Sequence, residues 1–282
     1  MHRREFLSWL VSAAGLCLAG RSAAATAAPL SLGIMPFNSA LALLKTHQPL
    51  RDYLHTALGR PIEVFTSADY VTFINEVLDQ RFDLLIAGPH FAVMSVDRGY
   101  QPLFRYRATL QPVIVVGQDS PIHSVAELRG KRIGLSSRLS ISSIGGVRWL
   151  QEQGLQMGRD FQIVERATHG AAVAGVAVGD LDAALTTHTP LKQIPEDVRA
   201  KVRLLPTDIR VPHLMTLAHQ RLGKAEIGRI RAALATFSEK APQGRVFFEE
   251  TAYQGYEPVT AADIQAMRPY VELTRNMLGL AQ

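Results

Sequence analysis

The residues with the clearest chemical potential are the serines of one short segment. Residues 136–143 read Ser-Ser-Arg-Leu-Ser-Ile-Ser-Ser and join an apolar run at 132–135 to a predicted helix from about residue 142. Backbone N–H groups in the first turn of a helix have no partner inside the helix, and the helix dipole favours negative charge at that end. Serine hydroxyls add further donors there. The segment therefore predicts a binding site for a small oxyanion.

A simpler interpretation of this segment remains open. Serine is a preferred residue at the start of a helix, where its side chain accepts a backbone hydrogen bond, so these serines could act only as caps. No residue nearby combines a nucleophile with an adjacent base. The segment thus favours binding over catalysis, and we do not expect an enzyme.

The first 28 residues have the pattern of a cleavable export signal. They begin with Arg3 and Arg4, continue with an apolar run at 6–20 and end in an alanine-rich stretch. This order of charge, apolar run and small residues predicts export and removal of the segment. The paired arginines resemble the twin-arginine export motif. We expect a periplasmic protein, with the twin-arginine route as one way to reach the periplasm.

Composition narrows the classes of function for the rest of the chain. The one cysteine, Cys17, lies within the predicted signal, so disulfides, thiolate metal sites and cysteine catalysis are not expected. An apolar fraction of 47% suits a folded chain long enough for two domains, and no later apolar run is long enough to cross a membrane. No basic block or stripe of basic and aromatic residues indicates nucleic acid as a partner.

Strand-like and helix-like segments alternate along the chain, which predicts α/β layers with largely parallel strands. We expect strands at 30–34, 62–65, 84–87, 113–116, 132–135, 161–164, 183–186 and 214–218, and helices at about 39–58, 69–78, 142–153, 171–178, 226–240 and 261–277. Crossings near 113–117 and 206–216 would join two lobes and leave a cleft between them. Ligands in open parallel sheets bind beyond the carboxyl ends of strands, so the loops at these ends should form the site.

Several short runs together resemble a known family. They are 33–36 (Gly-Ile-Met-Pro), 49–54, 58–64, 67–70 (Ser-Ala-Asp-Tyr), 83–89 (Asp-Leu-Leu-Ile-Ala-Gly-Pro), 128–132, 169–172 (His-Gly-Ala-Ala) and 179–183 (Gly-Asp-Leu-Asp-Ala). In order and spacing they resemble the periplasmic binding proteins for phosphate, phosphite and phosphonates that serve ABC transporters, which are type II periplasmic binding proteins. The resemblance implies a two-lobed α/β clam with a hinge. We place the signal at 1–28, the first lobe at 29–115 plus 213–282, and the second lobe at 116–212.

The resemblance also implies roles for individual residues. Ser140 and Ser142 fall where the family places hydroxyls against the phosphorus oxygens of its ligand, and Ser137 falls where the family often has an aspartate. His169 matches a family histidine that reaches the same oxygens. Tyr70 matches a family tyrosine, although it could equally serve packing.

Two departures from the family pattern bear on the identity of the ligand. Where the family usually has a tyrosine shortly after Gly88-Pro89, this chain has His90 and Phe91. Where the family usually has an aspartate that can meet an amino group, this chain has Thr187, followed by His188. Without that carboxylate, an aminoalkylphosphonate is a less suitable ligand.

Other residues in the predicted cleft loops complete the candidate set. Histidines that converge there would strengthen oxyanion binding as they become protonated, whereas any one of them could instead be a surface residue. Phe37 and Phe91 could line the cleft or be buried inside a lobe, and Arg138 lies inside the serine segment. The candidate ligand-binding residues are Phe37, Tyr70, His90, Phe91, Ser137, Arg138, Ser140, Ser142, His169, Thr187, His188 and His213.

Three classes of function follow, with the first preferred. The first is a solute-binding protein that captures a small oxyanion and delivers it to an ABC permease. The second is a periplasmic sensor that presents its ligand to a membrane histidine kinase or chemoreceptor. The third, a hydrolase with histidine metal ligands, is disfavoured because no His-Glu-x-x-His spacing or serine elbow is present. We expect no cofactor and no metal, and the resemblance implies a monomer.

Overall fold

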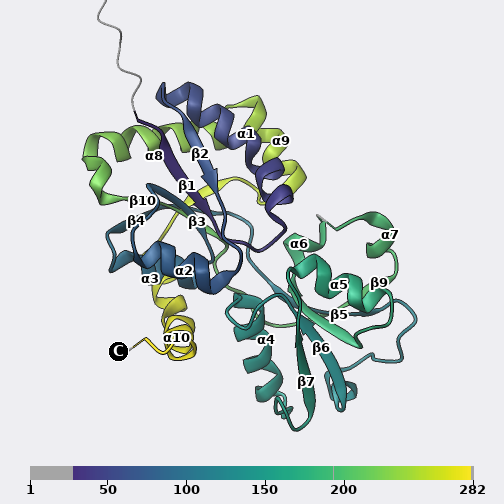
Figure 1. Cartoon of the computed structure of the whole chain (residues 1–282). Coiled ribbons are helices and arrows are strands. Elements are labelled where there is room, and N and C mark those ends of the chain that lie inside the picture. The colour runs from purple at the N-terminus through teal and green to yellow at the C-terminus, as the bar shows by residue number, and fades with distance from the viewer. Residues whose placement is uncertain (1–27, 193, 281–282) are drawn as a thin grey trace, which may run out of the picture.

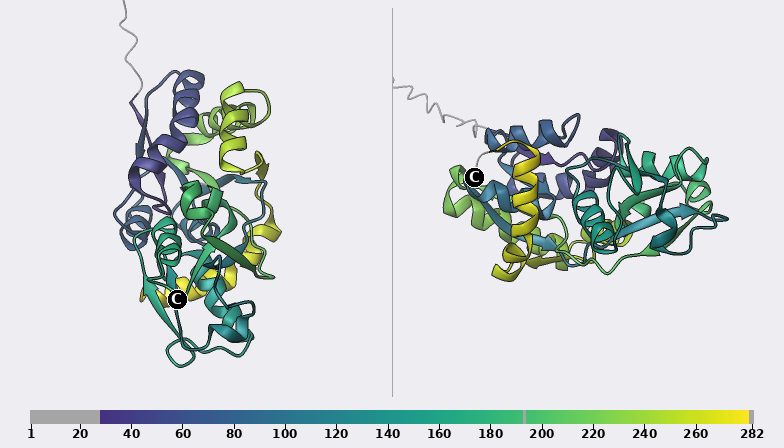
Figure 2. Two further views of the ribbon diagram at one scale, coloured as in Figure 1. Left: turned by 90° about the vertical axis from the view of Figure 1, so that its right-hand side faces the viewer. Right: turned by 90° about the horizontal axis from the view of Figure 1, so that it is seen from below.

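The computed structural model describes residues 28–192 and 194–280, which form two α/β lobes, each built on its own sheet. Figure 1 shows the lobes side by side, joined by crossing segments of the chain, and the view from below in Figure 2 shows the same arrangement. The two-lobed fold confirms the predicted fold class. The predicted export signal at 1–28 lies outside the described residues except for Ala28.

The first lobe contains a mixed sheet of six strands. In spatial order these are β11 (Tyr256–Pro258), β4 (Tyr100–Tyr106), β10 (Met215–His219), β3 (Leu84–Ala87), β1 (Leu30–Ile34) and β2 (Ile62–Phe65). β1 pairs in parallel with β2 and β3, whereas β10 and β11 form antiparallel pairs. The prediction of largely parallel strands was wrong for the pairs that β10 and β11 form. β10 enters the sheet from the second lobe and runs in the opposite direction to β3 and β4.

Helices cover both faces of this sheet. They are α1 (Ala40–Leu58), α2 (Tyr70–Leu78), α3 (Pro89–Val96), the short η2 (Gln220–Leu222), α8 (Gly223–Glu239), α9 (Pro242–Thr251) and α10 (Ala261–Met277). Figure 1 shows α1, α8 and α9 grouped together, and α10 beside α3. Because β1, β3 and β10 are covered on both faces, almost all of their side chains are buried, and most of these side chains are apolar. Among the helices of the described residues, none is both long and apolar enough to cross a membrane.

The second lobe contains a mixed sheet of five strands. In spatial order these are β7 (Phe161–Glu165), β6 (Lys131–Leu135), β8 (Ala183–Thr187), β5 (Pro112–Gly117) and β9 (Val202–Pro206). β6 pairs in parallel with β7 and β8, and β5 is antiparallel to both of its neighbours. The lobe also contains η1 (Val125–Leu128), α4 (Ile141–Glu152), α5 (His169–Ala177), α6 (His188–Lys192) and α7 (Glu196–Arg199). Parallel pairing brings the starts of α4 and α5 to one edge, because each helix follows one of these paired strands.

Two antiparallel segments connect the lobes. Leu110 and Val211 exchange backbone hydrogen bonds of 3.0 and 3.1 Å. They pack with Ile141 of α4 and Met267 of α10 in a small apolar cluster at the hinge. The segment 113–117, where we expected the first crossing, is instead β5 inside the second sheet, so the chain crosses just before it. β5 begins at Pro112 and β9 ends at Pro206, and both belong to the second sheet. The strands thus divide the chain near residues 111 and 207.

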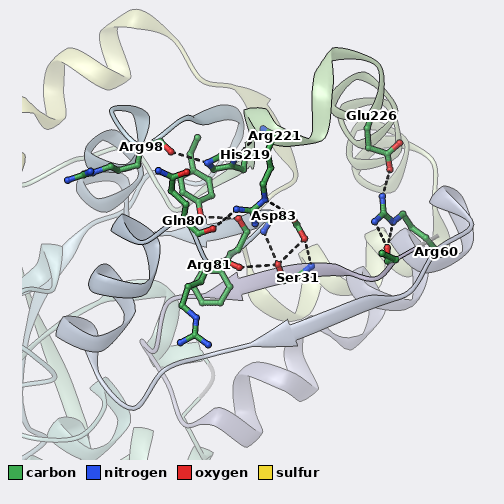
Figure 3. A network of polar contacts seen from close by, with 12 residues as sticks. Ser31, Arg60, Gln80, Arg81, Asp83, Arg98, His219, Arg221 and Glu226 are labelled. Carbon is green, nitrogen blue, oxygen red and sulfur yellow. Dashed lines mark hydrogen bonds and ion pairs between the residues drawn. The ribbon is translucent and has the colours of Figure 1, made fainter. Parts of the chain in front are cut away.

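A charged network joins the amino ends of β1 and β3 (Figure 3). The carboxylate of Asp83 accepts hydrogen bonds of 2.9 Å from the backbone N–H and the hydroxyl of Ser31, and another of 2.9 Å from the guanidinium of Arg221. Burial tends to raise the pKa of Asp83, but the bonds from Ser31 and Arg221 outweigh burial and lower it. This end of the sheet is therefore fixed by paired charges.

Candidate functional site

The candidate site lies where carboxyl ends of parallel strands from the two sheets face each other. Segments after β1 and β2 in the first lobe, and after β6, β7 and β8 in the second, meet around a cavity of about 30 Å³, room for one or two water molecules. The lining residues are Met35, Phe37, Tyr70, Leu110, Ser140, Ile141, His169, Thr187, Pro190, His213, Leu214 and Tyr253. Six of the twelve predicted site residues are among them: Phe37, Tyr70, Ser140, His169, Thr187 and His213.

Ser140 brings a hydroxyl of the second lobe to the cavity. It is the N-cap of α4, where its side chain accepts a hydrogen bond of 3.1 Å from the backbone N–H of Ser143. Its hydroxyl oxygen also lies 3.0 Å from that of Ser142 and 2.7 Å from that of Ser143. Capping and anion binding, which were alternatives from the sequence, are therefore compatible in this residue: it caps the helix and lines the cavity.

His169 brings the start of a second helix to the same cavity. It is the first residue of α5, whose N-cap Thr168 accepts a hydrogen bond of 3.1 Å from the backbone N–H of Ala171. Its Nε2 lies 3.3 Å from the hydroxyl of Ser136, whereas its buried Nδ1 has no hydrogen-bond partner among the described residues. Burial lowers the pKa of His169 to about 4. The ring is therefore neutral near pH 7 and has one nitrogen available to a ligand.

Tyr70 and Phe37 approach the cavity from the first lobe. Tyr70 is the first residue of α2, after the N-cap Asp69, and it is almost fully buried. Its hydroxyl faces Ser136 but has no hydrogen bond of ordinary geometry within the described chain. Burial raises the pKa of Tyr70 well above its usual value, so the hydroxyl stays protonated and can donate. The ring of Phe37 supplies an apolar wall.

Thr187 and His213 complete the polar lining. Thr187 ends β8 and is buried, and His213 lies in the second crossing segment. The backbone N–H of Leu214 donates to Nδ1 of His213 over 2.8 Å, so in the neutral ring Nε2 carries the proton. Burial, together with His188 and Arg105 nearby, lowers the pKa of His213 to about 3. His188 itself lies behind the lining, where its Nδ1 accepts a hydrogen bond of 3.3 Å from the backbone of Gln111.

The cavity combines many neutral donors with an absence of fixed charge. Among the described residues, none that line it is aspartate, glutamate, lysine or arginine. Within the same part of the chain, no group of three or more histidine, cysteine, aspartate or glutamate side chains is placed to hold a metal ion. An anion here would be held by hydroxyls, imidazoles and the positive ends of two helices.

Three predicted residues of the serine segment do not line the cavity. Ser142 is buried behind Ser140, and the Ser137 hydroxyl accepts a hydrogen bond of 3.1 Å from the backbone N–H of Leu139. Arg138 points to the surface, where its guanidinium lies 2.7 Å from Glu165. Arg138 instead borders a separate, mostly apolar hollow of about 570 Å³ between α4 and α10.

His90 and Phe91 also lie outside the lining. Phe91 is fully buried in the core of the first lobe. The Nε2 of His90 lies 2.9 Å from the carbonyl oxygen of Leu139, which belongs to the loop before α4. A carbonyl oxygen only accepts, so Nε2 is the protonated nitrogen and donates this bond across the lobes.

Half of the lining was not predicted from the sequence. These residues are Met35, Leu110, Ile141, Pro190, Leu214 and Tyr253. Met35 follows β1 directly, and Leu214 and Leu110 belong to or border the crossing segments, so position next to a strand end or a crossing is a signal that could have identified them. Tyr253 follows α9, far along the chain, and no local pattern marks it.

Comparison with known proteins assigns the chain to a family. The sequence model described as "ABC transporter, phosphonate, periplasmic substrate-binding protein" matches residues 32–264. Solved structures with the same fold include a binding protein component of an ABC phosphonate transporter from Pseudomonas aeruginosa, with a TM-score of 0.78 at 14% identity over 89% of this chain and 88% of that one. PhnD1 from Prochlorococcus marinus, in complex with methylphosphonate, has a TM-score of 0.77 at 14% identity over 90% of this chain and 99% of that one.

A third solved structure with the same fold holds an inorganic anion. XAC2383 from Xanthomonas citri, bound to chloride ion, has a TM-score of 0.71 at 18% identity over 88% of this chain and 99% of that one. At these identities the structures establish the shared fold, whereas the sequence match, which spans most of the chain, establishes the family. The chain belongs to the family of periplasmic substrate-binding proteins of ABC phosphonate transporters.

Proposed function

We propose that the protein captures a small phosphorus oxyanion of the phosphonate class between its lobes and delivers it to an ABC permease. One observation carries the proposal: two buried polar atoms of cavity-lining residues from different lobes, the Tyr70 hydroxyl and Nδ1 of His169, lack partners within the described chain. Buried polar groups are normally hydrogen-bonded, and each unsatisfied one costs about 1–3 kcal/mol. An oxyanion between the lobes would satisfy both groups at once.

The chemistry of the lining favours a phosphonate with an uncharged substituent. Phosphonate oxygens would face Ser140, His169 and Tyr70, and the organic group would face the apolar wall. A buried ammonium group needs a carboxylate partner, and Thr187 does not supply one. Methylphosphonate, the ligand of PhnD1, is therefore the first compound to test.

Transport is favoured over sensing, because the family match is to transporter components, which are substrate-binding proteins rather than enzymes. Family membership places the protein outside the cytoplasm. The proposal includes export by the signal at 1–28, by the twin-arginine route suggested by its arginine pair, and a monomeric mature protein. The expected lobes, 29–115 plus 213–282 and 116–212, would be divided near residues 111 and 207 instead, which keeps β5 whole in the second sheet.

A ligand panel tests the capture step. A ligand that binds only the folded state raises its melting temperature. We expect methylphosphonate to raise it, phosphate, phosphite and 2-aminoethylphosphonate to do so less, and sulfate to have the least effect, with calorimetry to give the affinities. If none of these anions raises the melting temperature, capture of a phosphorus oxyanion is rejected. Deletion of the gene in cells that use methylphosphonate as phosphorus source tests delivery to the permease. If the protein delivers this ligand, the cells should lose methylphosphonate uptake.

A further inference from the structure

The loop that presents Ser140 is held by the first lobe on both sides. Leu139, immediately before Ser140, is 5% exposed and its side chain belongs to the apolar core of the first lobe, although the residue follows a strand of the second. Ile141, immediately after Ser140, packs in the hinge cluster with Leu110, Val211 and Met267. Residues 139 and 141 are therefore both anchored outside their own lobe.

A buried hydrogen bond fixes the same loop. His90, in the first turn of α3, is fully buried, and its Nε2 donates to the carbonyl oxygen of Leu139 over 2.9 Å. Its ring packs against Phe91 at a centroid distance of 4.4 Å. It also lies so close to Gly88 that a Cβ atom there would be 3.1 Å from the ring. The ring thus has little freedom to turn away from the loop.

We propose that His90 is a positioning residue, which together with the inserted Leu139 forms an inter-lobe latch that holds the Ser140 loop closed on the cleft. The term latch denotes these two residues and their contacts. This inference rests on the proposed function. His90 acts through the backbone of Leu139 and not by contact with the ligand, since it does not line the cavity.

The size of the cavity gives the latch a kinetic consequence. A volume of about 30 Å³ is too small for a phosphonate, so a ligand enters only when the lobes separate, and the latch would re-form around it in a slightly wider cavity. Separation must withdraw Leu139 from the first lobe and break its bond to His90. The latch should therefore limit both entry and escape of the ligand, and the observed association rate should reach a plateau at high ligand concentration.

Matched variants distinguish the effect of losing the inter-lobe contacts from the effect of replacing any buried histidine. His90→Phe removes the inter-lobe hydrogen bond, and His90→Gln keeps an amide that can donate it. His47→Phe is the control: His47 is also fully buried with one unpartnered nitrogen, but its other nitrogen bonds Leu43 of its own helix over 2.9 Å. Leu139→Ala tests the inserted side chain, and circular dichroism verifies that each variant is folded.

The experiment is stopped-flow mixing with methylphosphonate, followed by the fluorescence of Trp149 on α4. Trp149 is the one tryptophan outside the predicted signal. His90→Phe and Leu139→Ala should raise the association plateau about tenfold and accelerate dissociation more, so that affinity falls, as expected for the loss of one buried hydrogen bond or apolar contact. His90→Gln and His47→Phe should behave like the wild type. Rates in His90→Phe and Leu139→Ala no different from those in His47→Phe would overturn the latch.

Small-angle scattering of the ligand-free protein gives a test that does not depend on the ligand. His90→Phe and Leu139→Ala should increase the radius of gyration, whereas His47→Phe should not. If the wild type bound no phosphonate but these variants still expanded, the proposed function would fail and the latch would stand. If the wild type bound methylphosphonate and neither variant changed size or kinetics, the latch would fail and the function would stand.

Discussion

The two ends of β1 and β3 differ in how they treat buried polar groups. At the amino ends, Asp83 is fully engaged by Ser31 and Arg221, and charge is paired (Figure 3). Beyond the carboxyl ends lies the cavity, whose lining carries no fixed charge; the hydroxyl of Tyr70, after β2, and Nδ1 of His169, from the second lobe, have no partners in the described chain. The difference indicates that one end stabilises the sheet, while the other retains binding capacity at a cost in stability.

Breaking the network at the amino end should have the largest effect on stability. Asp83→Ala removes the acceptor shared by Ser31 and Arg221 and leaves a half-buried guanidinium without its carboxylate partner. We expect the free energy of unfolding to fall by about 2 kcal/mol, with methylphosphonate affinity unchanged. Denaturant unfolding and calorimetry measure the two quantities. Asp97→Ala is the control, since its ion pair with Arg275 is exposed and should contribute little. Loss of affinity with intact stability would contradict the comparison.

Removing hydroxyls next to the cavity should lower the affinity more than the stability. Ser140→Ala combined with Ser142→Ala should weaken anion binding by at least about 1.4 kcal/mol, or tenfold, because it removes donors to a desolvated charge. Loss of the cap on α4 should also lower the stability by about 1 kcal/mol. Thr260→Ala, which removes the cap of α10, controls for that second effect. Wild-type affinity in the double variant would reduce these serines to caps.

The neutral histidines of the cleft predict a dependence on pH. Burial lowers the pKa of His169 to about 4, whereas an unfolded histidine titrates near about 6.5. Between these values the unfolded chain binds more protons, so the stability of the free protein should fall as the pH falls from about 6.5 toward 4. A bound oxyanion should raise the pKa of His169, so binding takes up a proton. The affinity should therefore rise as the pH falls from about 6.5 toward 4.

Calorimetry in buffers of different ionisation enthalpy measures this proton uptake. His169→Gln should reduce it, while ionisation of the ligand itself is common to both proteins. Equal uptake by the wild type and by His169→Gln would exclude His169 as the group that titrates.

The smallest expected effect is at Arg138. The side chain is half exposed and pairs with Glu165 outside the cleft. Arg138→Ala should therefore change methylphosphonate affinity by less than about twofold, in keeping with the small contribution of exposed ion pairs. A tenfold loss on titration would place this arginine in the binding site after all.

Local signals explain which elements were predictable. The strands at 30–34, 62–65 and 84–87 and the helix at 261–277 have the predicted bounds, because short apolar runs and a Thr260 cap mark their ends. α3 was missed: it is apolar on nearly all sides and buried, so it has no helical periodicity to detect. β9 and β11 were missed because their strand character depends on pairing with distant segments.

The site was predictable only where a residue lies next to a strand end or helix start. Ser140, His169 and Thr187 meet this condition, and the structure brings them together. The placement of Arg138 and His90 could not be read from the sequence, because the direction of a loop side chain depends on what packs around it. Tyr253 reaches the cavity from far along the chain, through packing of the first lobe that no local pattern specifies.

The most direct test of the account is a calorimetric titration of the purified protein with methylphosphonate, beside His169→Gln and Tyr70→Phe. These variants remove the two unpartnered polar groups that the two lobes bring to the cavity lining. The account predicts saturable binding at one site in the wild type and at least about fivefold weaker binding in each variant. Saturable binding that neither variant weakens would contradict it.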